Sequence, residues 1–235
     1  MNDSRHDSAS SNERPASVRE LFLVCAGTLG FIWTAYNLIN DHNRALAASG
    51  FQFHSLHTGI DDLIRFTPEF AWFYYSYYLV VFAVAVLAYS QRKVLYEVLT
   101  GYALMTVIGW ISWLTFPVQM VRPDVSTCMT MSCGLVKGMY EIDPGGYNVL
   151  PSLHTAHSVF VFLFFYKYDR TWSWFFAALG VCIIASTVFI KQHYFLDLPP
   201  GVLTGLAGYW VGTRYGLTLA TLAQRTTQLM RARIS

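Results

Sequence analysis

The stretch Asn148-Val149-Leu150-Pro151-Ser152-Leu153-His154 joins a glycine-containing polar loop to a strongly apolar run. A second polar cluster interrupts a later apolar run, with the sequence Lys191-Gln192-His193-Tyr194-Phe195-Leu196-Asp197. Ionisable side chains at the depth of a membrane are costly and are usually functional. We therefore interpret these two stretches as the halves of one site, and the rest of the chain as the frame that brings them together.

The composition indicates an integral membrane protein. Of the 235 residues, 54% are hydrophobic and 13% are charged, whereas soluble domains carry about 25% charged residues. The segments outside the apolar runs are too short to build a hydrophobic core of their own, so we expect a single domain. A net charge of +2 argues against a nucleic-acid partner.

The apolar runs predict an all-α membrane bundle of about six transmembrane helices, because a helical span needs about 20 mostly apolar residues. The expected spans are 20–40, 70–89, 94–116, 154–170, 171–190 and 194–215. A short amphipathic helix over 60–66 is expected to lie in the membrane interface and to end before Thr67-Pro68. A belt of aromatic residues from Trp72 to Tyr78 is expected at the headgroup level. We expect a long loop from 117 to 149.

The segments at the two ends of the chain are more polar than the predicted bundle. Residues 1–18 are polar and serine-rich, which predicts a disordered cytoplasmic tail. The membrane catalytic domain is then expected over 19–217, and a basic cytoplasmic tail over 218–235. A cleavable signal peptide is the alternative interpretation of the first apolar run, with Ala45-Leu46-Ala47 as its small-residue site. The length of that run favours a span.

The basic residues predict the orientation. With the N-terminus inside, eleven of the sixteen Lys and Arg residues fall in cytoplasmic segments, in agreement with the positive-inside rule. The other five are Arg44, Arg65, Arg122, Lys137 and Lys191. The same topology places Arg122 and both polar stretches on the outer side. We therefore expect a multi-pass protein of the cell membrane with its active site on the extracytoplasmic face.

Two pairs of residues outside the polar stretches also deserve an interpretation. Cys128 and Cys133 lie in the loop placed outside the cytoplasm, where disulfides persist, so a bridge is expected, with two free thiols as the alternative. His54 and His57 lack acidic or cysteine partners at metal-ligand spacing. Interfacial polar residues are therefore favoured over a metal site.

The residues of the two stretches indicate phosphoryl chemistry. His193 and Asp197 are four apart, which on a helix would place them on one face. A carboxylate on one imidazole nitrogen raises the basicity of the other, so His193 is a candidate nucleophile, and His154 a candidate proton donor. Arg122 suits phosphate oxygens, and Ser152 with nearby backbone amides would complete an anion site. The alternatives are a structural hydrogen bond for His193–Asp197, a helix cap for Ser152 and an interfacial anchor for Arg122.

Together these residues resemble the three-part signature of the type 2 phosphatidic acid phosphatase superfamily. The parts are Arg122-Pro123, Pro151-Ser152-Leu153-His154, and Ser186-Thr187 followed by His193 and Asp197, within a resemblance that covers residues 60–215. The resemblance implies that His193 is the nucleophile, that Asp197 orients it, and that His154 is the general acid and base. It also implies that the enzyme needs no metal and no other cofactor.

Three positions depart from the family pattern. Thr115 stands where the family has lysine, Leu153 where it has glycine, and Thr187 where it has arginine. These losses resemble the branch that includes inositol phosphorylceramide synthases, as does the Asp-Leu-Ile-x-Phe-x-Pro segment at 62–68. A phosphodiester carries less charge than a monoester and needs fewer cationic partners, each charged hydrogen bond contributing about 1.5–3 kcal/mol. Lys191 is a further candidate to bind phosphate, and Lys137 is its alternative.

We therefore expect a membrane-embedded lipid phosphotransferase that moves a phosphoryl headgroup from a lipid donor to an alcohol acceptor through a phosphohistidine. A phosphatase that acts on a lipid phosphate or a polyprenyl phosphate is the first alternative, and a non-catalytic lipid-binding or transport scaffold is the second. The expected partners are the lipid bilayer and a membrane lipid substrate. The sequence does not indicate the oligomeric state.

Overall fold

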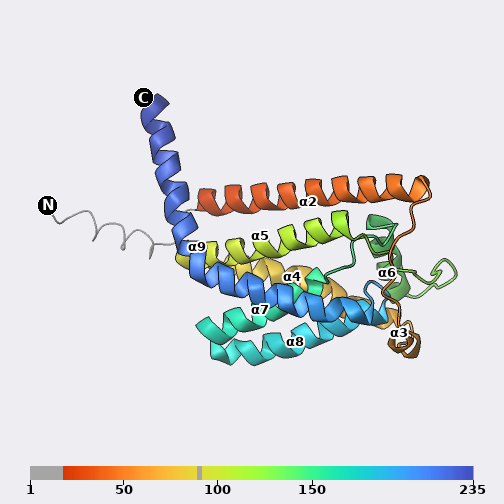
Figure 1. Ribbon diagram of the computed structural model, residues 1–235. Coiled ribbons are helices and arrows are strands. Elements are labelled where there is room, and N and C mark those ends of the chain that lie inside the picture. Colours follow the sequence, from red (N-terminus) through yellow and green to blue (C-terminus); the bar gives the residue numbers. More distant parts are fainter. Residues whose placement is uncertain (1–17, 89–91, 235) are drawn as a thin grey trace.

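The computed structural model describes residues 18–88 and 92–234 (Figure 1). In chain order the elements are α2 (Val18–Ala48), α3 (Gly59–Leu63), the 3-10 turn η1 (Pro68–Phe70), α4 (Ala71–Ala88), α5 (Arg92–Thr115), α6 (Met131–Ile142), α7 (Leu153–Tyr168), α8 (Arg170–Phe189), the 3-10 turn η2 (Phe195–Asp197) and α9 (Leu198–Ile234). Within these ranges the only extended pairings are single bridges from Val118 to His54 and to Asn148. The all-α prediction is confirmed, whereas the tail predicted over 1–18 lies outside the described residues except for Val18.

Two helices in the described part of the chain are long and apolar enough to cross a membrane, namely Lys93–Thr115 and Arg170–Phe189. They coincide with the third and fifth predicted spans. The helices α2, α4, α7 and α9 run along the same bundle (Figure 1). The count of six spans stays a prediction.

The structure differs from the predicted boundaries at both ends of the bundle. Helix α2 continues to Ala48, so Ala45-Leu46-Ala47 lies in its last turn. It continues because Asn40 and Asn43, which resemble a polar end in the sequence, are buried and paired with Asn148. Helix α9 begins at Leu198 instead of residue 194, and it runs through the predicted tail as far as Ile234.

Helix α6 occupies part of the segment predicted to be a loop. The side chain of Thr130 caps its first turn by accepting a hydrogen bond from the backbone N–H of Cys133 at 3.2 Å. Its buried residues, Cys133, Val136 and Met139, recur at intervals of three and form one apolar face. That periodicity was the available signal in the sequence, although the glycines and cysteines around it favour a loop.

Helix α9 packs against α5 and α7 through a face of small residues. A Cβ atom at Gly205 would lie 2.5 Å from the carbonyl oxygen of Ala156 in α7, and Gly212 lies directly on the backbone of Glu97 in α5. Small residues let helix backbones approach closely, which is how membrane helices pack without a strong hydrophobic driving force. This packing places the first turn of α9 beside the first turn of α7.

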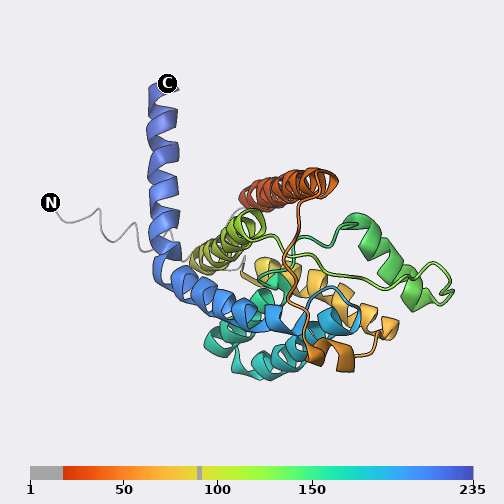
Figure 2. The same cartoon turned by 45° about the vertical axis from the view of Figure 1, so that its right-hand side comes forward.

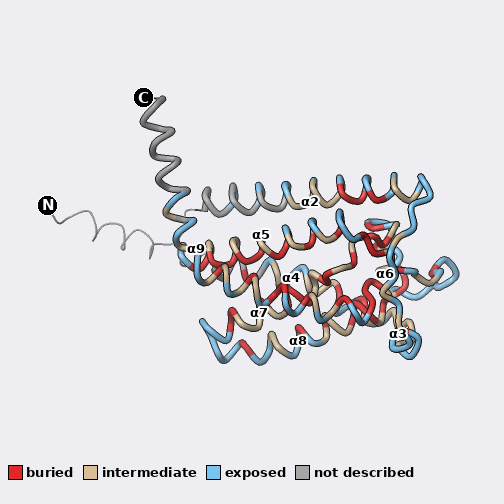
Figure 3. The backbone as a smooth tube through the Cα atoms, viewed as in Figure 1, coloured by how far each residue is buried: buried red, intermediate tan, exposed pale blue. Residues whose placement is uncertain are grey.

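Both polar stretches lie at one end of the bundle, together with α3 and α6. This is the right-hand end in Figure 1, and Figure 2 shows the same grouping after a rotation. Buried residues continue from the helices into the loops at this end (Figure 3). The loops therefore form a packed layer that fixes the positions of their side chains.

We predict that Gly205→Ala destabilises the bundle. The added methyl group must push α9 away from α7, and overpacking of this kind costs about 1–3 kcal/mol. The midpoint of thermal unfolding in detergent should fall by about 2 °C or more. Gly30→Ala is the matched control, because a Cβ at Gly30 would meet nothing within 4 Å. An equal midpoint for both variants would contradict the close contact.

Candidate active site

Asp197 joins the two polar stretches. It is fully buried, and its backbone carbonyl accepts a hydrogen bond from the N–H of Ser152 at 3.3 Å. Its Oδ2 accepts from the N–H of Tyr194 at 2.8 Å and lies 3.2 Å from Nδ1 of His193. Nε2 of His193 in turn lies 3.2 Å from Nδ1 of His154. The result is a continuous chain of three side chains, Asp197–His193–His154.

The pair of His193 and Asp197 forms, but the reason given by the sequence is wrong, because the two residues do not share a helix. His193 lies in a turn that precedes η2. The backbone N–H groups of Gln192 and His193 both donate to the carbonyl of Thr187 at the end of α8, at 2.8 and 3.0 Å. The carboxylate then reaches the imidazole because η2 folds Asp197 back toward the N–H of Tyr194.

The hydrogen-bond chain assigns the tautomer of His193. An ionised carboxylate only accepts hydrogen bonds, so Nδ1 of His193 carries the proton that faces Asp197. Nε2 of His193 then carries a lone pair and accepts a hydrogen bond from Nδ1–H of His154. Nε2 of His154 has no hydrogen-bond partner among the described residues. The arrangement leaves His193 Nε2 as the basic and nucleophilic nitrogen.

Two tyrosines of α4 enclose His154. Its ring centroid lies 4.7 Å from that of Tyr74 and 4.4 Å from that of Tyr77. The hydroxyl of Tyr77 lies 2.8 Å from Nδ1 of His157, one turn further along α7. The sequence analysis assigned these tyrosines to a belt at the headgroup level, although their spacing of three places them on one helix face. That face contacts His154, and aromatic rings stabilise a protonated imidazole by cation–π attraction.

Arg122 is buried in a set of partners that the sequence analysis did not name. Its Nη2 lies 2.8 Å from Oδ2 of Asp143 and 2.5 Å from Oε1 of Gln192. Its Nη1 donates to the backbone carbonyl of Asp143. The guanidinium also lies over the ring of Tyr140, with Cζ 4.6 Å from the centroid. Burial raises the pKa of Tyr140, whose neutral hydroxyl donates to the carbonyl of Ile190 at 2.6 Å.

The remaining phosphate-binding candidates have partners within the protein. Ser152 is fully buried and caps α7, its Oγ accepting from the N–H of Thr155 at 3.3 Å. Nζ of Lys191 donates to the carbonyl of Asp61 at 2.9 Å and to that of Ile64 at 2.6 Å, at the end of α3. A role of either side chain in binding phosphate stays a prediction. Through these two bonds Lys191 ties α3 to the loop that carries His193.

Thr115 and Thr187, which replace the lysine and the arginine of the family pattern, lie in different surroundings. Thr115 is exposed at the end of α5, and its hydroxyl donates to the carbonyl of Ile111 at 2.7 Å. Thr187 is fully buried, and its hydroxyl donates to the carbonyl of Ile184 at 2.8 Å. Neither position supplies a cation. Of the three cationic positions in the family pattern, this sequence therefore keeps only Arg122.

A pocket of about 560 Å³ lies beside Arg122, between α3 and the loop that leads to Pro123. Its lining includes Arg122 and Lys191 together with His57 and Asp62, but neither His154 nor His193. Nε2 of His57 lies 2.9 Å from Oδ1 of Asp62, so His57 has an acidic partner that the sequence analysis missed. Among residues 18–88 and 92–234, no three His, Cys, Asp or Glu side chains gather in a way that would hold a metal ion.

Comparison with known families decides the assignment. The sequence matches the PAP2 superfamily over residues 43–211, which is more than half of the chain and includes both polar stretches. The chain belongs to the PAP2 superfamily. The searches of curated proteins and of solved structures returned no match.

PAP2 membership confirms the resemblance at the level of the superfamily. It makes the chain a phosphatase-like enzyme of a helical membrane fold, in a superfamily that acts on lipid phosphates. The narrower likeness to inositol phosphorylceramide synthases stays a prediction. The match also covers the loop that carries Arg122 and helix α6.

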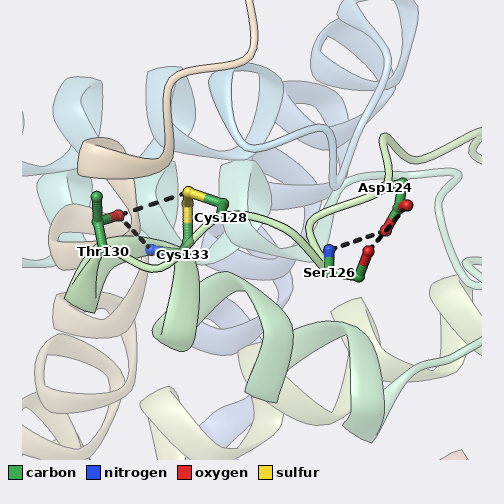
Figure 4. The surroundings of a disulfide bond; sticks show 5 residues. All are labelled: Asp124, Ser126, Cys128, Thr130 and Cys133. Atoms are coloured by element: carbon green, nitrogen blue, oxygen red, sulfur yellow. Dashed lines mark hydrogen bonds between the residues drawn. A yellow bond between two sulfur atoms is a disulfide. The ribbon is translucent and has the colours of Figure 1, made fainter.

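The expected disulfide joins Cys128 and Cys133 in the structure, at the start of α6 (Figure 4). We predict that alkylation of the unfolded protein without reductant labels neither cysteine, and that labelling after reduction adds both. Mass analysis of the intact chain and of its peptides checks this, with Cys182, a free thiol, as the internal control. Label on Cys128 and Cys133 without reductant would show that the bridge is absent.

Proposed function

We propose that this PAP2 protein is a membrane-embedded phosphotransferase that moves a phosphoryl headgroup from a lipid donor to an alcohol acceptor. The observation that carries the proposal is the chain Asp197–His193–His154. Nε2 of His193 attacks phosphorus, and the bond from phosphorus to the lipid oxygen breaks while His154 gives that oxygen its proton. The acceptor alcohol then gives its proton to His154 and attacks phosphorus, which releases His193. Asp197 stabilises the imidazolium of His193 throughout.

The contact between the histidines supports these two roles. Before a substrate binds, Nδ1 of His154 lies within hydrogen-bond distance of the nitrogen that would attack. The proton donor and the nucleophile therefore meet at one point, and a phosphoryl group placed there would touch both. The tyrosines on either side of His154 keep its ring at this point.

The charges around the site favour a diester over a monoester. A lipid phosphomonoester is nearly a dianion at neutral pH, whereas a phosphodiester is a monoanion. The site has lost two family cations at Thr115 and Thr187, and Arg122 is already paired with Asp143. The pocket beside Arg122 has the size of a headgroup or acceptor site. Hydrolysis of a lipid phosphate or polyprenyl phosphate is the alternative, in which water replaces the alcohol.

The proposed location is the extracytoplasmic face of the cell membrane. Its support is the distribution of basic residues, because Arg92 begins α5 and Lys167 lies in the last turn of α7, both at the end of the bundle away from the site. Cytoplasmic ends of membrane helices are enriched in such residues. The disulfide between Cys128 and Cys133 agrees with an oxidising compartment.

We predict that His193→Ala lowers turnover by at least about a thousandfold, since loss of a nucleophile removes the covalent route. The measurement is release of the lipid alcohol in detergent micelles, with folding checked by thermal unfolding. His42→Ala is the matched control, because His42 is an exposed histidine in α2. If His193→Ala keeps turnover within tenfold of the wild type, the phosphohistidine mechanism is wrong. A non-catalytic scaffold would show no turnover before the substitution.

His154→Ala should slow turnover mainly for esters whose leaving oxygen is basic. Proton donation matters most when the departing alkoxide is a poor leaving group. A lipid ester should therefore lose about a hundredfold or more, and a nitrophenyl ester of the same phosphate much less. Equal losses for the two esters would contradict the assignment of His154 as the acid.

Transfer and hydrolysis are separated by an added alcohol. With a phosphodiester lipid in micelles, we expect turnover to rise with the concentration of a polyol acceptor such as glycerol, and the headgroup phosphate to appear on that acceptor. Mass spectrometry of the products measures both. Turnover that is independent of the acceptor, with the phosphate released into water, would replace the transferase by the hydrolase.

A further inference from the structure

The guanidinium of Arg122 is neutralised within the protein before any substrate binds. The side chains of Arg122 and Asp143 are only 9% and 8% exposed, and Nη2 lies 2.8 Å from Oδ2 of Asp143. The second hydrogen of Nη2 faces Oε1 of Gln192, 2.5 Å away. At low exposure an ion pair is weakly screened, so its charges largely cancel in their effect on a third group.

Polar atoms of this pair, and one of His154, lack partners. Nε of Arg122, Oδ1 of Asp143 and Nε2 of His154 have no hydrogen-bond partner among the described residues. An unsatisfied buried polar atom is costly, so a ligand group that pairs with it would bind favourably. Nε–H of Arg122 suits a phosphate oxygen, as does Nε2 of His154 once its ring is protonated, whereas the free carboxylate oxygen of Asp143 repels one. The site therefore combines attraction for a phosphoryl group with a penalty on its negative charge.

Lys191 does not replace the charge that Arg122 loses to Asp143. Nζ of Lys191 is directed to two backbone carbonyls at the end of α3. Asp197, fully buried beneath the histidines, adds a second carboxylate. Pairing with Asp143 removes most of the attraction of Arg122 for an anion, and that attraction would be about twice as large for a ligand with two negative charges as for a ligand with one.

We propose that Asp143 is a specificity-determining residue that selects a singly charged phosphodiester over a doubly charged phosphomonoester. This deepens the proposed function and rests on it for the identity of the reaction. Asp143 acts through Arg122 and through its own charge, without taking part in the chemical steps. The competing explanation is that Asp143 only holds Arg122 in place, in which case its loss would weaken both classes of ester alike.

The test is Asp143→Asn in the full chain in micelles, with kcat/KM measured for phosphatidic acid and for phosphatidylglycerol. The amide keeps the shape of the side chain and removes its charge. We expect the monoester-to-diester ratio to rise by about tenfold or more, which is about 1.4 kcal/mol of differential stabilisation. Asp143→Glu, which keeps the charge, should retain the wild-type ratio.

Asp124→Asn is the matched control for charge in the same loop. Asp124 accepts hydrogen bonds from the backbone N–H and the hydroxyl of Ser126, at 2.8 and 3.0 Å (Figure 4). These bonds lower the pKa of its carboxyl, so the substitution also removes a negative charge, but at the surface. Its ratio should match the wild type. A shift equal to that of Asp143→Asn would mean that net charge, and not the pairing of Arg122, sets the ratio, and would overturn the proposal.

Binding without turnover gives a second measurement. The increase in thermal stability with inorganic phosphate and with dimethyl phosphate reports the two affinities. Asp143→Asn should bind inorganic phosphate about tenfold tighter or more and leave dimethyl phosphate within about threefold. If Asp143→Asn does not fold, Gln192→Glu adds a charge at the other partner of Nη2 and should weaken inorganic phosphate selectively.

An unchanged ratio for Asp143→Asn, with or without a parallel loss for both ester classes, also overturns the proposal. A failure of the proposed function would give a different experimental result from a failure of the Asp143 proposal. A wild type that transfers to no acceptor and only hydrolyses would exclude the transferase. The affinities for inorganic phosphate and dimethyl phosphate would still decide the role of Asp143.

Discussion

A buried carboxylate organises the candidate site. Asp197 has no exposed surface, and a charge in that position is tolerated only when it is hydrogen-bonded. Its Oδ2 accepts from the N–H of Tyr194 and from Nδ1 of His193, and its backbone carbonyl accepts from the N–H of Ser152. Each bond fixes a different segment, so the orientation of the nucleophile and the start of α7 depend on one residue.

The other polar segments at this end extend the same layer. Asp61 of α3 accepts from the N–H of Phe195 at 2.8 Å, which holds η2 against α3. Nδ2 of Asn148 donates to Oδ1 of Asn40 at 2.8 Å, which fixes the end of α2. Because buried polar groups need partners, each of these contacts determines which segments can be neighbours. The layer therefore positions the site more tightly than apolar packing alone would.

The opposite end of the bundle repeats this principle away from the site. Glu97 of α5 is buried, lies 2.9 Å from Nζ of Lys167 at the end of α7, and accepts from the hydroxyl of Tyr168. Between the two polar ends the core is formed by apolar side chains such as Leu95, Phe160 and Ile183. The bundle thus has polar contacts at both ends and apolar contacts in its middle.

Most of the confirmed predictions depend on residues that are close together in the sequence. The all-α class, two of the apolar spans, the contact of His193 with Asp197, and the pairing of Cys128 with Cys133 all depend on neighbours within a few residues. Such features follow from helix length, local geometry and short loops, so the sequence contains them. Helix α6 is the exception, because its apolar face is short and lies among residues typical of loops.

The sequence by itself determined the chemical groups of this protein, the membrane environment and the order in which the groups occur. Only the tertiary structure decided their partners. Arg122 pairs with Asp143 at a separation of 21 residues, and Lys191 reaches Asp61 at a separation of 130. No local pattern encodes such pairs, because they form where packed helices bring distant loops together and each buried charge must find a partner there.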